Sequence, residues 1–123
     1  MKAEVTWFEI PANNFERAVK FYEEVFSVKL IDLSCNGEMM ACFPGGDGKS
    51  PGAVIAADGY KPSENGIIIS FDAGPNLNET LRTVESSGGK VVMPKTKIDA
   101  EGRGYFAIFT DTEGNRLGLY SDK

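Results

Sequence analysis

Histidine is absent from this chain of 123 residues, and only two cysteines are present. A serine or cysteine nucleophile normally works beside a base, most often a histidine, so the sequence gives little support for nucleophilic catalysis. The two cysteines flank Asn36-Gly37, a pair that predicts a two-residue hairpin turn. In that register Cys35 faces Glu38 and Cys42 faces Ile31, so the sequence predicts two free thiols and no disulfide.

Long apolar runs and basic runs are also missing. No stretch approaches the roughly 20 apolar residues that a membrane-spanning helix needs, and the formal net charge is −5 with no cluster of Lys and Arg. We therefore expect neither a membrane nor a nucleic acid as a partner. The N-terminus lacks a basic segment followed by an apolar run, and together with the free thiols this indicates a cytoplasmic protein.

What is present is the composition of one folded domain. Hydrophobic residues make up 41% of the chain and charged residues 25%, which is typical of a globular protein with a core. The length suffices for one domain and is too short for two ordinary ones. We expect a single domain over 1–123.

The first half of the chain predicts the element order βαβββ. Residues 3–10 read as a strand, and residues 13–26 carry apolar side chains at helical spacing. Asn13 with Glu16 three residues later has the form of a capping box. The segments KLIDLS, EMMACFP and AVIAA then predict three strands, the first two joined by the hairpin turn.

The second half repeats this order. IIISFDA predicts a strand, Asn76 with Glu79 offers a second capping pattern, and Gly88-Gly89 ends the helix. KVVMPKTKI, YFAIFT and NRLGLY predict three more strands. We therefore divide the domain into a first module at 1–58, a connector at 59–66 and a second module at 67–123.

Three segments carry a resemblance to a known family: WFEIPANNFERAVKFYEEVF, GGKVVMPKT and FAIFTDTEGNRLGLYS. With the paired modules, the sequence resembles the vicinal oxygen chelate superfamily, which includes glyoxalase I, extradiol dioxygenases and bleomycin-resistance proteins. The resemblance implies an α+β fold of two βαβββ modules, whose curled mixed sheets form a cleft with the helices outside. It also implies a homodimer. Because this scaffold hosts many reactions, it does not identify the chemistry.

Metal enzymes of that family hold a divalent ion with His and Glu side chains from both modules. Their pattern places the ligand positions at Trp7, near Ala56, near Gly66 and at Gly118. None of these side chains binds a metal, and Glu9 is the only clear carboxylate among the cavity-facing strand positions. We expect no metal and no cofactor.

Trp7 and Glu9 are the leading site candidates. Strand alternation directs Phe8 and Ile10 toward the core, and Trp7 and Glu9 toward the cavity. Trp7 either lines the cavity and stacks on a ligand or fills the space that a metal would occupy. Glu9 is either a hydrogen-bonded or paired carboxylate, or a general base, and it is the best candidate for a catalytic residue.

The last strand supplies further candidates on the same face. Alternation places Leu117 and Leu119 toward the core, and Arg116 and Tyr120 on the opposite face. Arg116 could pair with Glu9, grip a substrate carboxylate, or lie in solvent beside the DTEGN turn, which we interpret as structural. Ser70 is expected on the cavity face of the fifth strand, where its hydroxyl could meet a ligand.

The segment GRGY gives the last two candidates. Arg103 and Tyr105 lie among glycines just before a strand, so this loop either closes over a ligand or simply leads into the strand. GYKPS, with Tyr60, is the other candidate rim segment.

Three functions are compatible with these residues, and the third is a small structural or regulatory dimer whose cavity is filled. The first is a metal-independent protein that binds an unknown small molecule, similar to the antibiotic-sequestering members of the family. The alternative is a glyoxalase-like isomerase or lyase that uses Glu9 as a proton shuttle without the usual metal.

Overall fold

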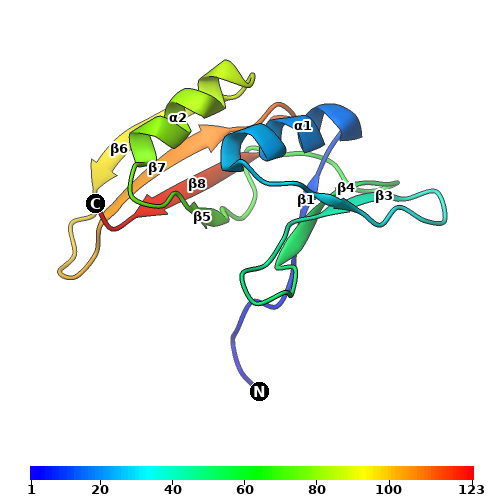
Figure 1. The fold of residues 1–123 in the computed structure, drawn as a ribbon, viewed down its shortest axis with the longest axis horizontal. Coiled ribbons are helices and arrows are strands. Elements are labelled where there is room, and N and C mark those ends of the chain that lie inside the picture. Colours follow the sequence, from blue (N-terminus) through cyan, green and yellow to red (C-terminus); the bar gives the residue numbers. More distant parts are fainter.

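A computed structural model describes residues 1–123, and it contains two βαβββ modules (Figure 1). The first module consists of β1 (Phe8–Pro11), α1 (Phe15–Phe26), β2 (Ile31–Asp32), β3 (Met39–Cys42) and β4 (Gly52–Ala56). The second consists of β5 (Ser70–Asp72), α2 (Leu77–Ser86), β6 (Lys90–Lys97), β7 (Tyr105–Thr110) and β8 (Arg116–Ser121). The expected order of elements is therefore confirmed in both halves. No helix is both long enough and apolar enough to cross a membrane.

Each module forms one mixed sheet of four strands. The strand order is β1-β4-β3-β2 in the first sheet and β5-β8-β7-β6 in the second. In both sheets the first strand pairs in parallel with the last strand of its module, and the other pairs are antiparallel. Figure 1 shows both sheets open, with α1 and α2 side by side on the same side of them. The opposite faces of the sheets are therefore left for a binding site.

Aromatic side chains join the two modules in one core. Phe71 of β5 packs against Phe8 and Phe43 of the first module, with ring centroids 5.7 and 5.6 Å away, and against Phe26 of α1 at 4.6 Å. Each such pair contributes about 0.5–1.5 kcal/mol beyond the burial of its area. A single buried cluster contains residues from both halves, so the modules pack as one unit.

The local signals near the hairpin are confirmed. Asn36 and Gly37 have φ values of 51° and 79°, as a turn of type I′ requires. Cys35 lies opposite Glu38, and Cys42 lies opposite Ile31. Both cysteines are free thiols.

Two boundaries differ from the sequence prediction. The first strand begins at Phe8 and not at residue 3, because its partner β4 begins at Gly52 and offers residues 3–7 nothing to pair with. The cap of α1 is Asn14, not Asn13: Asn14 Oδ1 accepts from the Arg17 N–H at 3.1 Å. In the second module Asn76 caps α2 as expected, accepting from the Glu79 N–H.

Candidate functional site

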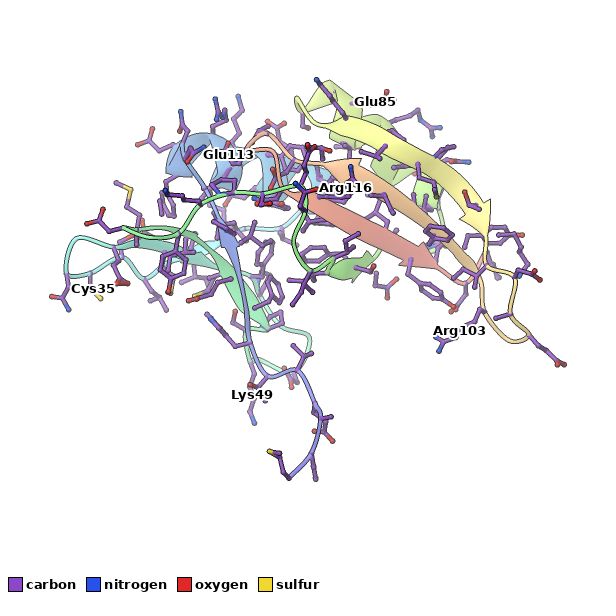
Figure 2. All side chains as sticks on the ribbon, turned by 180° about the vertical axis from the view of Figure 1, so that it is seen from behind. Cys35, Lys49, Glu85, Arg103, Glu113 and Arg116 are labelled. Carbon is purple, nitrogen blue, oxygen red and sulfur yellow. The ribbon has the colours of Figure 1, made fainter.

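A cleft of about 510 Å³ opens between the modules, within the size range of small-molecule sites. One side is formed by β1 and the residues that precede it, and the other by the connector and the start of β8. Half of the residues that line the cleft are apolar; the full set is Val5, Trp7, Phe8, Glu9, Ile10, Pro11, Lys61, Ser63, Gly66, Ile67, Ile69, Asn115, Arg116 and Leu117. Figure 2 shows Arg116 in the middle of the molecule, between the two sheets.

Trp7 lies at the wall of this cleft, directly before β1. Its neighbour Phe8 turns to the core, where it contacts Phe43, and Ile10 is buried. Trp7 itself is 41% exposed. A side chain that filled a packed cavity would be buried, so the structure places Trp7 as a lining residue with a free aromatic surface.

Glu9 also lines the cleft and is half-buried. It forms no ion pair with Arg116. The two ion pairs of the chain join Arg17 to Glu113 and Lys20 to Glu24. The neighbour of Glu9 is Tyr60 of the connector: the negative charge of Glu9 raises the pKa of the Tyr60 hydroxyl above its ordinary value. The carboxylate of Glu9 therefore lies near a phenol and forms no ion pair.

Arg116 has an unusual environment for a guanidinium group. It is the first residue of β8, opposite Thr110, and it lines the cleft. Its Nε atom is buried and has no hydrogen-bond partner. A buried donor without a partner costs roughly 1–3 kcal/mol, and no carboxylate of the chain pairs with this guanidinium. Because Arg116 is only half-buried and lines the cleft, an acceptor in the cleft can meet its guanidinium.

Ser70 lies outside the cleft, contrary to the expected placement. It is exposed and pairs with Gly118, and a Cβ atom at Gly118 would lie only 2.4 Å from the Ser70 Oγ atom. The hydroxyl thus takes the space that the missing side chain of Gly118 leaves. Ile67 and Ile69 reach the cleft instead.

The three other predicted residues also lie elsewhere. Tyr120 donates to Asp122 Oδ1 at 2.9 Å and accepts from the Gly104 N–H at 3.1 Å, so its hydroxyl fastens the β6–β7 loop. The Lys95 ammonium lies 4.5 Å from the centre of the Tyr105 ring. Arg103 is exposed at the tip of that loop, far from Arg116 in Figure 2.

Three further polar residues line the cleft: Lys61, Ser63 and Asn115. Lys61 and Ser63 belong to GYKPS, the candidate rim segment, whereas sequence reasoning missed Asn115, which lies in the turn interpreted as structural. Asn115 holds the connector in place, since its Nδ2 donates to the Pro11 carbonyl at 2.8 Å and its Oδ1 accepts from the Ser63 N–H at 3.1 Å. The connector has no periodicity from which an inward face could be predicted. Its composition indicated a loop at the rim, but not which of its side chains face the cleft.

The residues present do not fit the metal centre of the family's enzymes. No group of three or more Cys, Asp and Glu side chains lies close enough together to hold an ion. The expected ligand position at Gly118 has no room for a side chain beside Ser70, and Trp7 offers an indole in place of a ligand. We therefore derive no chemical step through a metal.

The sequence matches the model of the Glyoxalase/Bleomycin resistance protein/Dioxygenase superfamily over residues 4–119. The chain belongs to this superfamily. A glyoxylase-like domain-containing protein from Didymella fabae is 29% identical over 121 residues, which cover 94% of this chain and 91% of that protein.

Solved structures of the superfamily have the same fold. A glyoxalase/bleomycin resistance protein/dioxygenase family enzyme from Burkholderia phytofirmans has a TM-score of 0.72 at 15% identity, covering 98% of this chain and 100% of that chain. TnmS3, an antibiotic binding protein from a Streptomyces species, has a TM-score of 0.63 at 20% identity, covering 99% and 98%. At these identities the likeness confirms the α+β fold class of two modules with mixed sheets and leaves the activity open.

Proposed function

We propose that this member of the glyoxalase and bleomycin-resistance superfamily binds a small organic molecule in the cleft between its modules, without a metal ion. The observation that carries the proposal is the cleft itself: it has a suitable volume, and the accessible face of Trp7 forms one of its walls. Burial of apolar area against Trp7 and the isoleucines of the connector side supplies the affinity. TnmS3, which shares the fold, is an antibiotic binding protein, and this supports a role in binding.

The residues at the expected ligand positions support the metal-independent form of this proposal. Trp7 and Gly118 carry no donor suited to a divalent ion, and the sole carboxylate of the cleft is Glu9. The proposal thus includes the loss of the side chains that would coordinate a metal. The small molecule is held by apolar contact area and by a few polar groups. Native mass spectrometry of protein purified without chelator tests this directly, because one retained ion per chain would contradict it.

A neutral fluorescent probe tests binding in the cleft. N-phenyl-1-naphthylamine brightens in apolar surroundings, and we expect it to bind the wild-type protein. Trp7→Ala should weaken binding about tenfold, which corresponds to about 1.4 kcal/mol, whereas Leu33→Ala, which removes an exposed leucine outside the cleft, should not. Equal affinities of the two variants would show that the probe binds elsewhere.

We also propose that the chain forms a homodimer, as its resemblance to small members of the family implied. Support comes from the exposed apolar side chains of Val92 and Met93 on β6, an edge strand of the second sheet, because a second chain can cover such an edge. Size-exclusion chromatography with light scattering measures this. The mass of a single chain at micromolar concentration would contradict the proposal.

A second candidate function is favoured by the surroundings of Glu9. Its carboxylate lies in the cleft with no cation paired to it and with a phenol at its side, so it is free to take a proton from a carbon next to a carbonyl group. Deuterium exchange of hydroxyacetone in D2O, followed by NMR, measures such a step. Exchange that the wild type catalyses and Glu9→Gln does not would establish this step. If the wild type exchanges no faster than buffer without protein, the enzyme proposal is wrong and the binding proposal is unaffected.

A further inference from the structure

The charge of the cleft is opposite to the charge of the protein. The chain has a formal net charge of −5, yet the lining of the cleft contains Lys61 and Arg116 against one carboxylate, Glu9, so that the lining carries +2 − 1 = +1. A positive cleft in an acidic protein attracts anions into the site and repels them from the rest of the surface.

The hydrogen-bond donors of the cleft that lack a partner within the chain also favour an anion. The Asn115 amide group is already used, because it donates to Asp111 and to the Pro11 carbonyl. Lys61 and Arg116 donate no hydrogen bond to another residue of the chain. The free donors of the cleft are therefore mainly cationic, and their natural acceptor is an anion.

A second arginine of this chain shows how such a group is satisfied. Arg17 engages Glu113 through Nε and Nη2, at 2.7 and 3.1 Å. Arg116 has no carboxylate in the corresponding position, and its Nε atom is buried without any acceptor. Two parallel hydrogen bonds of this kind fit the flat geometry of a carboxylate.

We propose that the ligand of the cleft is an organic monoanion, a carboxylate on a planar or branched apolar body, whose carboxylate the guanidinium group of Arg116 holds. This inference rests on the proposed binding function and names its ligand class. The single net positive charge of the lining balances one negative charge, and Glu9 disfavours a second. The apolar body lies against Trp7, Ile67 and Ile69.

Three probes of the same shape test the inference by isothermal titration calorimetry at pH 7: naphthalene-2-carboxylate, the neutral naphthalene-2-carboxamide and the cationic naphthalen-2-ylmethylamine. We expect the carboxylate to bind at least tenfold more tightly than the carboxamide, and the amine to bind most weakly. Naphthalene-2,6-dicarboxylate should bind no more tightly than the monocarboxylate.

Variants at Arg116 then identify the group responsible. Arg116→Gln should weaken the carboxylate at least tenfold and leave the carboxamide within about threefold, so that the preference for the anion is lost. Arg116→Lys, which keeps the charge without the planar donor set, should restore part of the preference. Arg103→Gln removes an exposed arginine outside the cleft and should change neither affinity. Urea unfolding of each variant shows that the fold is retained.

The contrary outcomes are distinct. If the carboxamide binds as tightly as the carboxylate, or if Arg116→Gln weakens both equally, the anion inference is wrong and the proposed binding function stands. If no probe binds, the proposed function is wrong, and the inference fails with it.

Discussion

The Arg17 Nε atom donates a hydrogen bond to Glu113 Oε2 at 2.7 Å, and this contact joins the first turn of α1 to the β7–β8 turn. The side chain of Glu113 is fully buried. Its Oε1 atom also accepts from the backbone N–H groups of Asn13 and Asn14, at 3.0 and 2.7 Å, and Thr112 donates to Oε2. One carboxylate of the second module thus satisfies the start of the first helix, which needs acceptors for its N–H groups.

Replacing this carboxylate should destabilise the junction of the modules. Glu113→Gln keeps the shape but turns charge-assisted bonds into neutral ones and faces Arg17 with an amide, so the free energy of unfolding should fall by about 2–3 kcal/mol. Urea unfolding followed by circular dichroism, at one fixed protein concentration, measures the loss. Glu24→Gln is the matched control, because Glu24 is exposed and lies 4.0 Å from Lys20, and it should change stability by no more than about 0.5 kcal/mol. Equal effects of the two substitutions would contradict the claim that Glu113 stabilises the junction of the modules.

Stability should fall with acid in a way that depends on Glu113. Burial alone would raise its pKa, but hydrogen bonds from Arg17 and from the Asn14 N–H outweigh burial and hold the pKa below the ordinary value of 4.5. A carboxylate with a lowered folded-state pKa stabilises the protein at pH values above 4.5, and this stability is lost as the pH falls toward the folded-state value. Urea midpoints at pH 7, 5, 4 and 3 should therefore fall more steeply in the wild type than in Glu113→Gln below pH 4.5. Parallel curves would contradict this assignment.

Tyr22 should ionise only when the protein unfolds. Burial raises the pKa of its hydroxyl well above the ordinary 10.0, and the negative charge of Asp111 adds to this, since the Tyr22 hydroxyl donates to Asp111 Oδ2 at 2.5 Å. A raised folded-state pKa contributes stability below pH 10 that is lost as the pH rises above it. Absorbance at 295 nm should show that one of the four tyrosines ionises together with alkaline unfolding. In Tyr22→Phe this final step should be missing; a fourth tyrosine ionising in the folded wild type would contradict the prediction.

Signals that act over a few residues predicted most of the fold. Helical spacing located α1 and α2, the Asn36-Gly37 pair fixed the register of β2 and β3, and the residues facing each cysteine followed from it. Alternation along β1 predicted that Phe8 and Ile10 pack in the core; it did not predict that both also border the cleft beside Trp7 and Glu9. Each of these predictions depends on backbone geometry that neighbouring residues determine.

The residues that sequence reasoning misplaced depend on contacts between distant parts of the chain. Asn13 looked like the cap of α1, but its N–H donates to Glu113, 100 residues away, and Asn14 caps the helix instead. Lys61 belongs to the expected rim segment, but its place in the lining of the cleft depends on Asn115, which holds the connector, and no pattern within the connector indicates this contact. Such positions are set by the packing of the modules against each other, which a single sequence does not reveal.

Gly118 and Ser70 should show coupled effects on stability, because the serine hydroxyl occupies the space of the missing side chain. A Cβ atom at Gly118 would lie 2.4 Å from Ser70 Oγ and 3.3 Å from Ser70 Cβ, so Gly118→Ala should cost about 1–3 kcal/mol through overpacking. In a Ser70→Ala background the same substitution should cost less by about 1 kcal/mol, since the closest clash is then absent.

Gly66→Ala is the matched control at another expected ligand position. A Cβ atom there meets nothing within 4 Å, and stability should change by no more than about 0.5 kcal/mol. A double-mutant cycle from urea unfolding measures the coupling. Additive effects would mean that Ser70 moves aside freely, and the steric objection to a ligand side chain at Gly118 would then no longer hold.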